Sequence, residues 1–189
     1  MNAMNRPVII LGLGNPLMGD DGAGLAALEA LRDRYHFDSA VDLEDGGTLG
    51  LELLPLVEDA GSLLLLDAVR FGGDPGTIVK REGDQIPRCF AQKLSPHQIG
   101  FRETLALAGL RGKLPVRFAL IGVEVAEALY AEPLSLPVWS ALPAMIVAAA
   151  AQLQSWGCAV RPNPSPRSEH LFGSLWGPRT ASADRSAGV

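Results

Sequence analysis

Short, almost continuously apolar runs alternate with longer stretches of helical periodicity through the first 157 residues. Such runs are typical of strands covered on both faces, while leucines three or four residues apart predict amphipathic helices. The predicted strands are Val8–Leu13, 41–44, 62–66, 77–81 and 118–123. The predicted helices are 23–35, 49–57 (short), 101–108 and a last one from about 135 to 156, with Gly157 as its C-cap.

This alternation predicts a single α/β domain with a mostly parallel sheet and helices on both faces. In such a sheet, ligands bind beyond the carboxyl ends of the strands. The residues that follow strands are therefore the first candidates for chemistry: 14–21, 45–48, 67–69 and Glu124 onward.

The apolar pattern stops near Arg161, where proline, serine, glycine and arginine become dominant. We therefore divide the chain into an α/β domain over residues 1–160 and a flexible C-terminal tail over 161–189.

Composition narrows the classes of protein that remain. Hydrophobic residues make up 48% of the chain and the formal net charge is −5, so a buried core is expected and a nucleic-acid partner is not. The longest apolar stretch, 141–153, is shorter than the roughly 18–20 residues that span a bilayer, which predicts a core helix without membrane insertion. Cys89 and Cys158 are read as free thiols, so we expect a cytoplasmic protein.

The loop after the first strand, residues 12–24, is rich in glycine and contains two adjacent acids, Asp20 and Asp21. Gly12 and Gly14 fit the start of a dinucleotide-binding turn, but Leu17 stands where its third glycine belongs. Two carboxylates at a helix start would also repel a pyrophosphate. A Rossmann-like dinucleotide-binding enzyme stays open as the alternative.

Three side chains from separate segments could form one metal-binding cluster. The three are Asp21, Asp67 and His97. Only one of the two adjacent acids can cap the helix, so the other is directed to the crevice; Asp67 follows four leucines, and His97 lies after Pro96. Each also has a structural explanation, as a cap of a helix or loop. Together, two carboxylates and one imidazole suit nickel, zinc, cobalt or iron.

A second glycine turn, Asp45-Gly46-Gly47-Thr48, allows a ligand or peptide to approach the backbone closely. The sequence has no HExxH or GxSxG motif.

With these motifs, residues 8–157 resemble the [NiFe]-hydrogenase maturation endopeptidases. The matching segments are Gly12-x-Gly14-Asn15-x-Leu17-x-x-Asp20-Asp21-Gly22-x-Gly24, Asp45-Gly46-Gly47-Thr48, Asp67-Ala68 and Ser95-Pro96-His97-Gln98. The resemblance implies a five-stranded twisted sheet between helices. It also implies an enzyme that cuts the hydrogenase large subunit near its C-terminus, once nickel has been inserted.

The resemblance assigns nickel recognition to Asp21, Asp67 and His97, with nickel carried by the substrate. The first of these ligands is often Glu in the family and is Asp here. Asp20 is a possible supporting group, and Gly46, Gly47 and Thr48 are expected to form a substrate loop. The partner implied is the large-subunit precursor, and we expect the protease to be a monomer. A non-catalytic nickel-dependent maturation factor would use the same cluster and also stays open.

Overall fold

The computed structural model describes residues 6–86, 96–125, 130, 132–167 and 177, and for Pro96 and His97 it describes the backbone alone. A five-stranded sheet forms the centre of the molecule, in the order β3-β1-β4-β6-β5. Its first four strands are parallel and β5 runs antiparallel to β6, which confirms the mostly parallel sheet. The strands are β1 (Val8–Leu13), β3 (Val41–Gly47), β4 (Ser62–Val69), β5 (Ile78–Glu82) and β6 (Arg117–Glu124).

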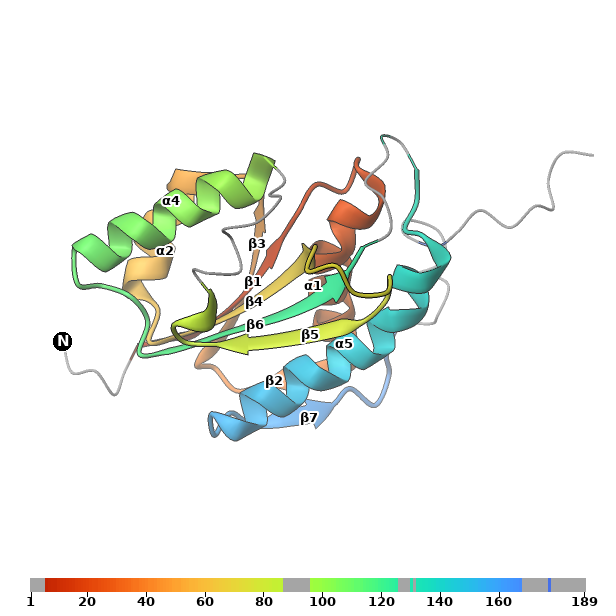
Figure 1. Cartoon of the computed structure of the whole chain (residues 1–189). Helices are drawn as coiled ribbons and strands as arrows, with labels where there is room; N and C mark the ends of the chain where they lie inside the picture. Colours follow the sequence, from red (N-terminus) through yellow and green to blue (C-terminus); the bar gives the residue numbers. More distant parts are fainter. Residues whose placement is uncertain (1–5, 87–95, 126–129, 131, 168–176, 178–189) are drawn as a thin grey trace, which may run out of the picture.

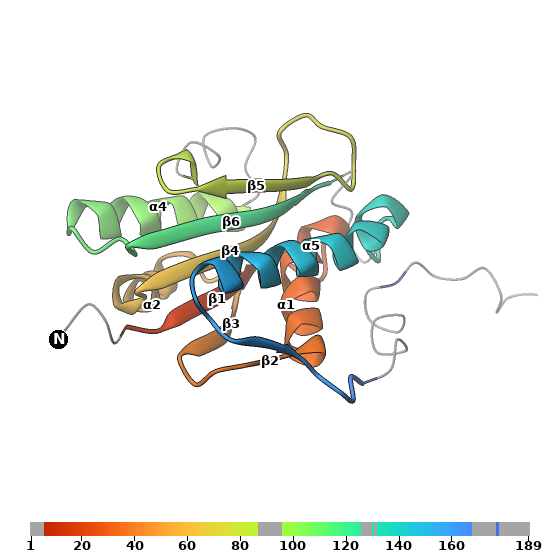
Figure 2. The same ribbon diagram turned by 90° about the horizontal axis from the view of Figure 1, so that it is seen from below.

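Two helices cover one face of this sheet, and two further helices cover the other (Figure 1). The first face holds α1 (Ala23–Arg34) and α5 (Leu136–Ser155), and the second holds α2 (Leu54–Asp59) and α4 (Pro96–Leu110). The side chains of successive strand residues point to opposite faces of the sheet. Ile10 packs with α1 and α5, and Leu11 packs with α2 and α4. Figure 2, seen from below, shows α5 passing in front of the strands.

Burial on both faces explains why β4 is apolar along most of its length. All eight of its residues are buried, including the four leucines that precede Asp67. Since full burial of a leucine side chain contributes about 1.5–3 kcal/mol, this strand is a major source of stability.

Three predicted element ends differ from the structure by three residues or more, and all three lie near the candidate site. β4 runs to Val69, so Asp67 lies within the strand and does not end it. β3 continues through Gly47, so Asp45, Gly46 and Gly47 belong to the strand and only Thr48 starts the turn. α4 begins at Pro96, well before the predicted start at Phe101.

The predicted short helix over 49–57 is two consecutive pieces, a 3-10 helix (Gly50–Leu53) followed by α2. Pro55 lies in the first turn of α2, where a missing N–H costs no intrahelical hydrogen bond.

A short antiparallel ribbon was not predicted from the sequence. It pairs β2 (Tyr35–Phe37) with β7 (Val160–Pro162), so Arg161 and Pro162, which we assigned to the tail, are strand residues. Beyond the ribbon, the Asn163 side-chain amide donates a hydrogen bond to the Asp33 carbonyl (2.7 Å). Most of the expected tail, 168–176 and 178–189, lies outside the described residues.

Helix α5 has no charged side chain and ends at Ser155, with Trp156 as its C-cap. Gly157, which we predicted as the C-cap, is the next residue, and its φ of 87° is the left-handed conformation that commonly follows a helix. Among the described residues it is the one helix long and apolar enough to cross a membrane, judged by length and composition alone. Core helices meet the same criterion. One face of α5, including Met145 and Leu153, is buried in the cluster that also contains α1.

Candidate active site

The order of the strands places the topological switch point of the sheet between β1 and β4, where open α/β sheets form a crevice. The chain leaves β1 for β3 on one side and later returns to β4 on the other, so the connections after β1 and β4 diverge. In open α/β sheets, this divergence is where ligands bind. Asp21 lies in the loop that follows β1, and Asp67 lies near the end of β4.

The loop after β1 folds back on itself at Gly14. The φ of this residue is 128°, and a Cβ atom there would lie 1.9 Å from the Asp21 carbonyl oxygen, so only glycine fits. The folded loop lets the Asn15 N–H donate to Oδ2 of Asp21 (3.1 Å). Asp21 is 8% exposed, and it lies in a 3-10 helix (Gly19–Gly22) just before α1.

Asp20 binds a distant part of the chain. The Ser135 N–H donates to its Oδ1 (2.7 Å) and the Ser135 hydroxyl donates to its Oδ2 (2.9 Å). Helix α1 begins without a side-chain cap, so the expectation that one of the two acids caps it was wrong. The Asp20 carboxylate instead accepts hydrogen bonds from Ser135, the N-cap residue of α5.

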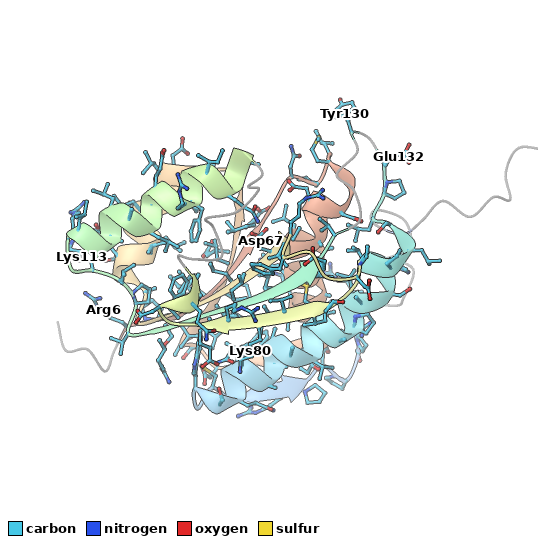
Figure 3. The ribbon with its side chains drawn as sticks, in the orientation of Figure 1. Arg6, Asp67, Lys80, Lys113, Tyr130 and Glu132 are labelled. Atoms are coloured by element: carbon cyan, nitrogen blue, oxygen red, sulfur yellow. The ribbon has the colours of Figure 1, made fainter. Side chains whose placement is uncertain are left out.

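Asp67 has no solvent exposure and is held from two directions. Its own neighbour, the Ala68 N–H, donates to Oδ1 (2.8 Å), and Nε2 of Gln98 donates to Oδ2 (2.7 Å). The same Gln98 nitrogen donates to the Ala68 carbonyl (2.8 Å). Figure 3 labels Asp67 inside the molecule, near the end of β4.

The described backbone brings all three expected ligand segments to one end of the sheet. Gly12 of β1 pairs with Leu66 of β4, so Asp67 is level with the end of β1. Gly24, at the start of α1, is so close to both strands that a Cβ atom would lie 2.4 Å from the Leu13 carbonyl oxygen and 2.2 Å from the Leu66 carbonyl oxygen. The loop with Asp21 therefore lies over the ends of β1 and β4.

The backbone of His97 lies in the first turn of α4, one residue before Gln98. Its side chain lies outside the described residues. Among the side chains that are described, no group of three His, Cys, Asp or Glu residues is arranged to hold a metal ion. The two acids thus provide the described part of the proposed cluster, and α4 places the histidine backbone beside Asp67.

The expected substrate loop borders the same end of the sheet. Gly46 packs on the sheet's own side chains, since a Cβ there would lie 2.7 Å from Cδ1 of Leu11. The Gly47 carbonyl, at a residue with φ of 41°, accepts a hydrogen bond from the Gly14 N–H (3.0 Å). Thr48 is exposed. This loop is therefore bonded directly to the loop that carries Asp21.

Two side chains that organise this end of the sheet had no role assigned from the sequence. Gln98 was noted only as part of a motif, and Glu124 only as the start of the candidate segment that follows the last predicted strand. The Glu124 carboxylate is buried and accepts hydrogen bonds from the N–H groups of Phe71 and Gly72 (2.8–3.0 Å), which fixes the loop after β4. For Gln98 and Glu124, the only available signal in the sequence was a polar side chain next to an apolar or helical segment.

Cys158 lies beyond the C-terminal end of α5, whereas Ser135 and the site lie at the N-terminal end of that helix. It is a free thiol, and Cys89 lies outside the described residues. Burial raises the pKa of the Cys158 thiol, and the nearby Asp38 carboxylate adds to this effect. A neutral thiol far from the crevice is not a candidate nucleophile.

Comparison with known proteins identifies the family. Residues 25–152 match the HycI family model, described as hydrogenase maturation protease. The hydrogenase expression/formation protein HupD of Rhizobium leguminosarum is 39% identical over 159 residues, which cover 83% of this chain and 79% of that protein. The Escherichia coli hydrogenase 2 maturation protease is 36% identical over 117 residues, covering 61% and 71%.

Among solved structures, the E. coli hydrogenase maturating endopeptidase HybD superposes with a TM-score of 0.80 at 30% identity, covering 83% of this chain and 98% of that one. The family match includes Asp67, His97 and the segment 45–48, and it begins just after the loop that contains Asp20 and Asp21. The chain belongs to the hydrogenase maturation protease family.

Proposed function

We propose that the protein is an endopeptidase that removes a C-terminal peptide from the large-subunit precursor of a [NiFe] hydrogenase after nickel insertion. Family membership supports the reaction class. The observation that carries the site assignment is the meeting of the Asp21 loop, Asp67 and the first turn of α4 at the end of β1 and β4. We further propose that the protease works in the cytoplasm as a monomer.

The donor set suits a metal that arrives with the substrate. Two carboxylates and an imidazole without a thiolate bind free nickel only modestly, but they can add ligands to a nickel ion already held by substrate thiolates. A carboxylate oxygen such as those of Asp67 has two lone pairs, so it can accept a hydrogen bond and also bind a metal. Such a site recognises the nickel-loaded precursor and places its scissile bond in a single binding step.

Placement of the peptide bond is the main catalytic contribution that we propose. A well-oriented bound reactant can contribute roughly 7–11 kcal/mol to lowering a barrier. Two routes to an activated water remain with the same residues: a carboxylate as general base, or the substrate's nickel as a Lewis acid. Asp20 acts in support, because its hydrogen bonds to Ser135 fix the loop that presents Asp21.

Substitution of the proposed ligands tests this function. We expect Asp21→Asn and His97→Ala to lower the rate of precursor cleavage by about 100-fold or more, since each removes a group that positions or activates the reactants. Cleavage is measured by mass spectrometry of a nickel-loaded large-subunit precursor. Asp42→Asn is the matched control, because Asp42 is an exposed carboxylate on the edge strand β3. All variants should retain the wild-type circular dichroism spectrum.

Further outcomes decide between the alternatives. If Asp21→Asn or His97→Ala cuts at the wild-type rate, the cluster assignment fails. Nickel-dependent binding of the precursor without loss of mass would support the non-catalytic maturation factor. Micromolar binding of NAD(P), followed by the fluorescence of Trp139, would support the dinucleotide-binding enzyme. Cleavage of the nickel-free precursor at the same rate would remove nickel from the mechanism.

A further inference from the structure

One side chain joins the first turn of α4 to the buried acid of β4. Gln98 is 7% exposed, and its Nε2 donates to Oδ2 of Asp67 (2.7 Å) and to the Ala68 carbonyl (2.8 Å). Asp67 and Gln98 are 31 residues apart in the chain, so this contact exists only in the folded protein. It is made directly beside His97.

The two acceptors fix the orientation of the amide. Both groups that face Nε2, a carboxylate oxygen and a carbonyl oxygen, can only accept hydrogen bonds, so the NH₂ end of Gln98 must point toward β4. On the other side of Asp67, Oδ1 accepts from the Ala68 N–H. With both oxygens engaged, rotation of the carboxylate would break a buried, charge-assisted hydrogen bond.

We propose that Gln98 is a positioning residue of the protease, which fixes the Asp67 carboxylate and links it to the helical turn that carries His97. This inference rests on the proposed function, in which both groups bind the substrate's nickel. Asp67 lies on β4 and His97 lies on α4. The Gln98 amide belongs to α4 and donates to β4, so it keeps the two ligands in a fixed relative position. Preorganised ligands of this kind owe their geometry to the hydrogen bonds around them.

Other contacts hold α4 in place, so the positioning role is separable from folding. Phe101 and Leu105 are buried against the sheet, and the Thr104 hydroxyl donates to the Gly50 carbonyl (2.8 Å). Gly50 and Gly100 pack backbone against backbone, since a Cβ at Gly100 would lie 3.0 Å from the Gly50 Cα. Loss of the Gln98 amide should therefore leave the helix docked.

The chain offers a matched control. Gln152 is also buried in a helix, at 3% exposure, but it lies on α5, and its Nε2 donates to Ser155 of the same helix. We compare Gln98→Met with Gln152→Met, because methionine has a similar length and no amide. Gln98→Met is expected to lower kcat/KM for the nickel-loaded precursor by about 10- to 100-fold, and Gln152→Met by less than about threefold. Both variants should melt cooperatively.

A second variant provides a measurement that would not change if Gln98 had a purely structural role. Gln98→Glu keeps the shape of the side chain but sets a carboxylate against Asp67. In Gln98→Glu, the donor that faces Oδ2 of Asp67 is replaced by an acceptor, so the hydrogen bond that fixes the carboxylate is lost. The preference for nickel-loaded over nickel-free precursor, measured as the ratio of the two Kd values, should fall about 10-fold or more in Gln98→Glu and Gln98→Met, and it should stay within about threefold of wild type in Gln152→Met.

The inference is overturned if Gln98→Met cuts within about threefold of wild type, or if Gln152→Met loses as much activity. It is also overturned if Gln98→Glu keeps the wild-type ratio of Kd values for nickel-free and nickel-loaded precursor, a result that can be read even if Gln98→Met fails to fold. Asp67→Asn is measured in parallel to separate the two proposals. Full activity in Asp67→Asn would contradict the proposed site itself, while an inactive Asp67→Asn with an active Gln98→Met contradicts only the role of Gln98.

Discussion

Asp20 and Asp21 are neighbours in the chain, but their carboxylates bind different parts of the molecule. Asp20 is buried and receives both hydrogen bonds that Ser135 donates, whereas Asp21 receives the N–H of Asn15 within its own loop. A charge can be buried in this way when its hydrogen-bonding capacity is met. The first acid therefore secures the loop, and the second remains at the crevice.

Removal of the first acid should affect stability more than chemistry. We expect Asp20→Ala to lower the free energy of unfolding by about 1–3 kcal/mol, because it leaves the partly buried N–H and hydroxyl of Ser135 without their acceptor. Equilibrium unfolding in urea measures the loss. Ser135→Ala, which removes only the hydroxyl donor, should cost less. Equal urea midpoints for Asp20→Ala and wild type would contradict this assignment.

The sequence indicated which acids are candidate site residues, but it did not indicate which groups form hydrogen bonds with them. Asp67 was noticed because a charged residue follows four leucines, and Asp21 because two acids begin a helix. Ser135 and Gln98 could not be paired with them, because the contacts span 115 and 31 residues and follow no local pattern. Long-range hydrogen bonds of this kind become visible only when the sheet sets the positions of its loops.

Among the elements, helix α1 approaches the sheet very closely at its first turn. Gly24 lies against the Leu13 and Leu66 carbonyls, where a methyl group would come within 2.2–2.4 Å of backbone oxygen. Backbone atoms of two strands cannot move aside as a flexible side chain can. This contact sets the distance between α1, with the Asp21 loop before it, and the strand that carries Asp67.

Gly24→Ala should therefore reverse the usual effect of alanine in a helix. Alanine in place of glycine normally stabilises a helix by roughly 0.5–1 kcal/mol. At position 24 we expect a lower melting temperature and slower precursor cleavage, because α1 must shift away from β1 and β4. Gly109→Ala is the control: it lies in α4, where the nearest atom, Cδ1 of Leu114, is at an ordinary 3.5 Å. That variant should be as stable as wild type or more so; a similar loss in both would contradict the steric explanation.

The types of the elements were predictable from the sequence. The predicted ends were wrong where function or packing overrides the local sequence pattern. β1 was predicted to the residue because its apolar run stops at a glycine loop. β4 was ended too early because a charged residue reads as a strand terminus, yet the Gln98 amide and the Ala68 N–H allow Asp67 to stay inside the strand. β3 was ended too early because two glycines favour a turn, although Gly46 fits there for close packing on Leu11.

At the scale of the whole molecule, the alternation of strands and helices predicted the fold class and the end of the sheet at which the candidate residues meet. The order of the strands was needed to show that β1 and β4 are neighbours. The ribbon of β2 and β7 was missed, because three-residue strands have too little pattern to be recognised.

The ribbon makes a prediction about truncation. A chain that ends at Arg167 keeps β7 and the hydrogen bonds that Asn163 and Arg167 make to Asp33, so its stability and activity should equal those of the full chain. A chain that ends at Gly157 loses them and uncovers apolar atoms beside α1; we expect a loss of at least about 2 kcal/mol. Thermal unfolding and cleavage of the precursor are compared. Loss of activity in the longer truncation product would show that residues after 167 contact the substrate.

The hydrogen bond from Ser135 to Asp20 spans 115 residues, and it has a consequence for the protein during its synthesis. The loop with both acids is made early, Asp67 and the α4 turn follow, and the residue that secures the loop leaves the ribosome only after most of the domain. A nascent chain cannot complete the crevice before that point, whatever strands have already paired. The protease therefore cannot complete this arrangement until its own Ser135 has been translated.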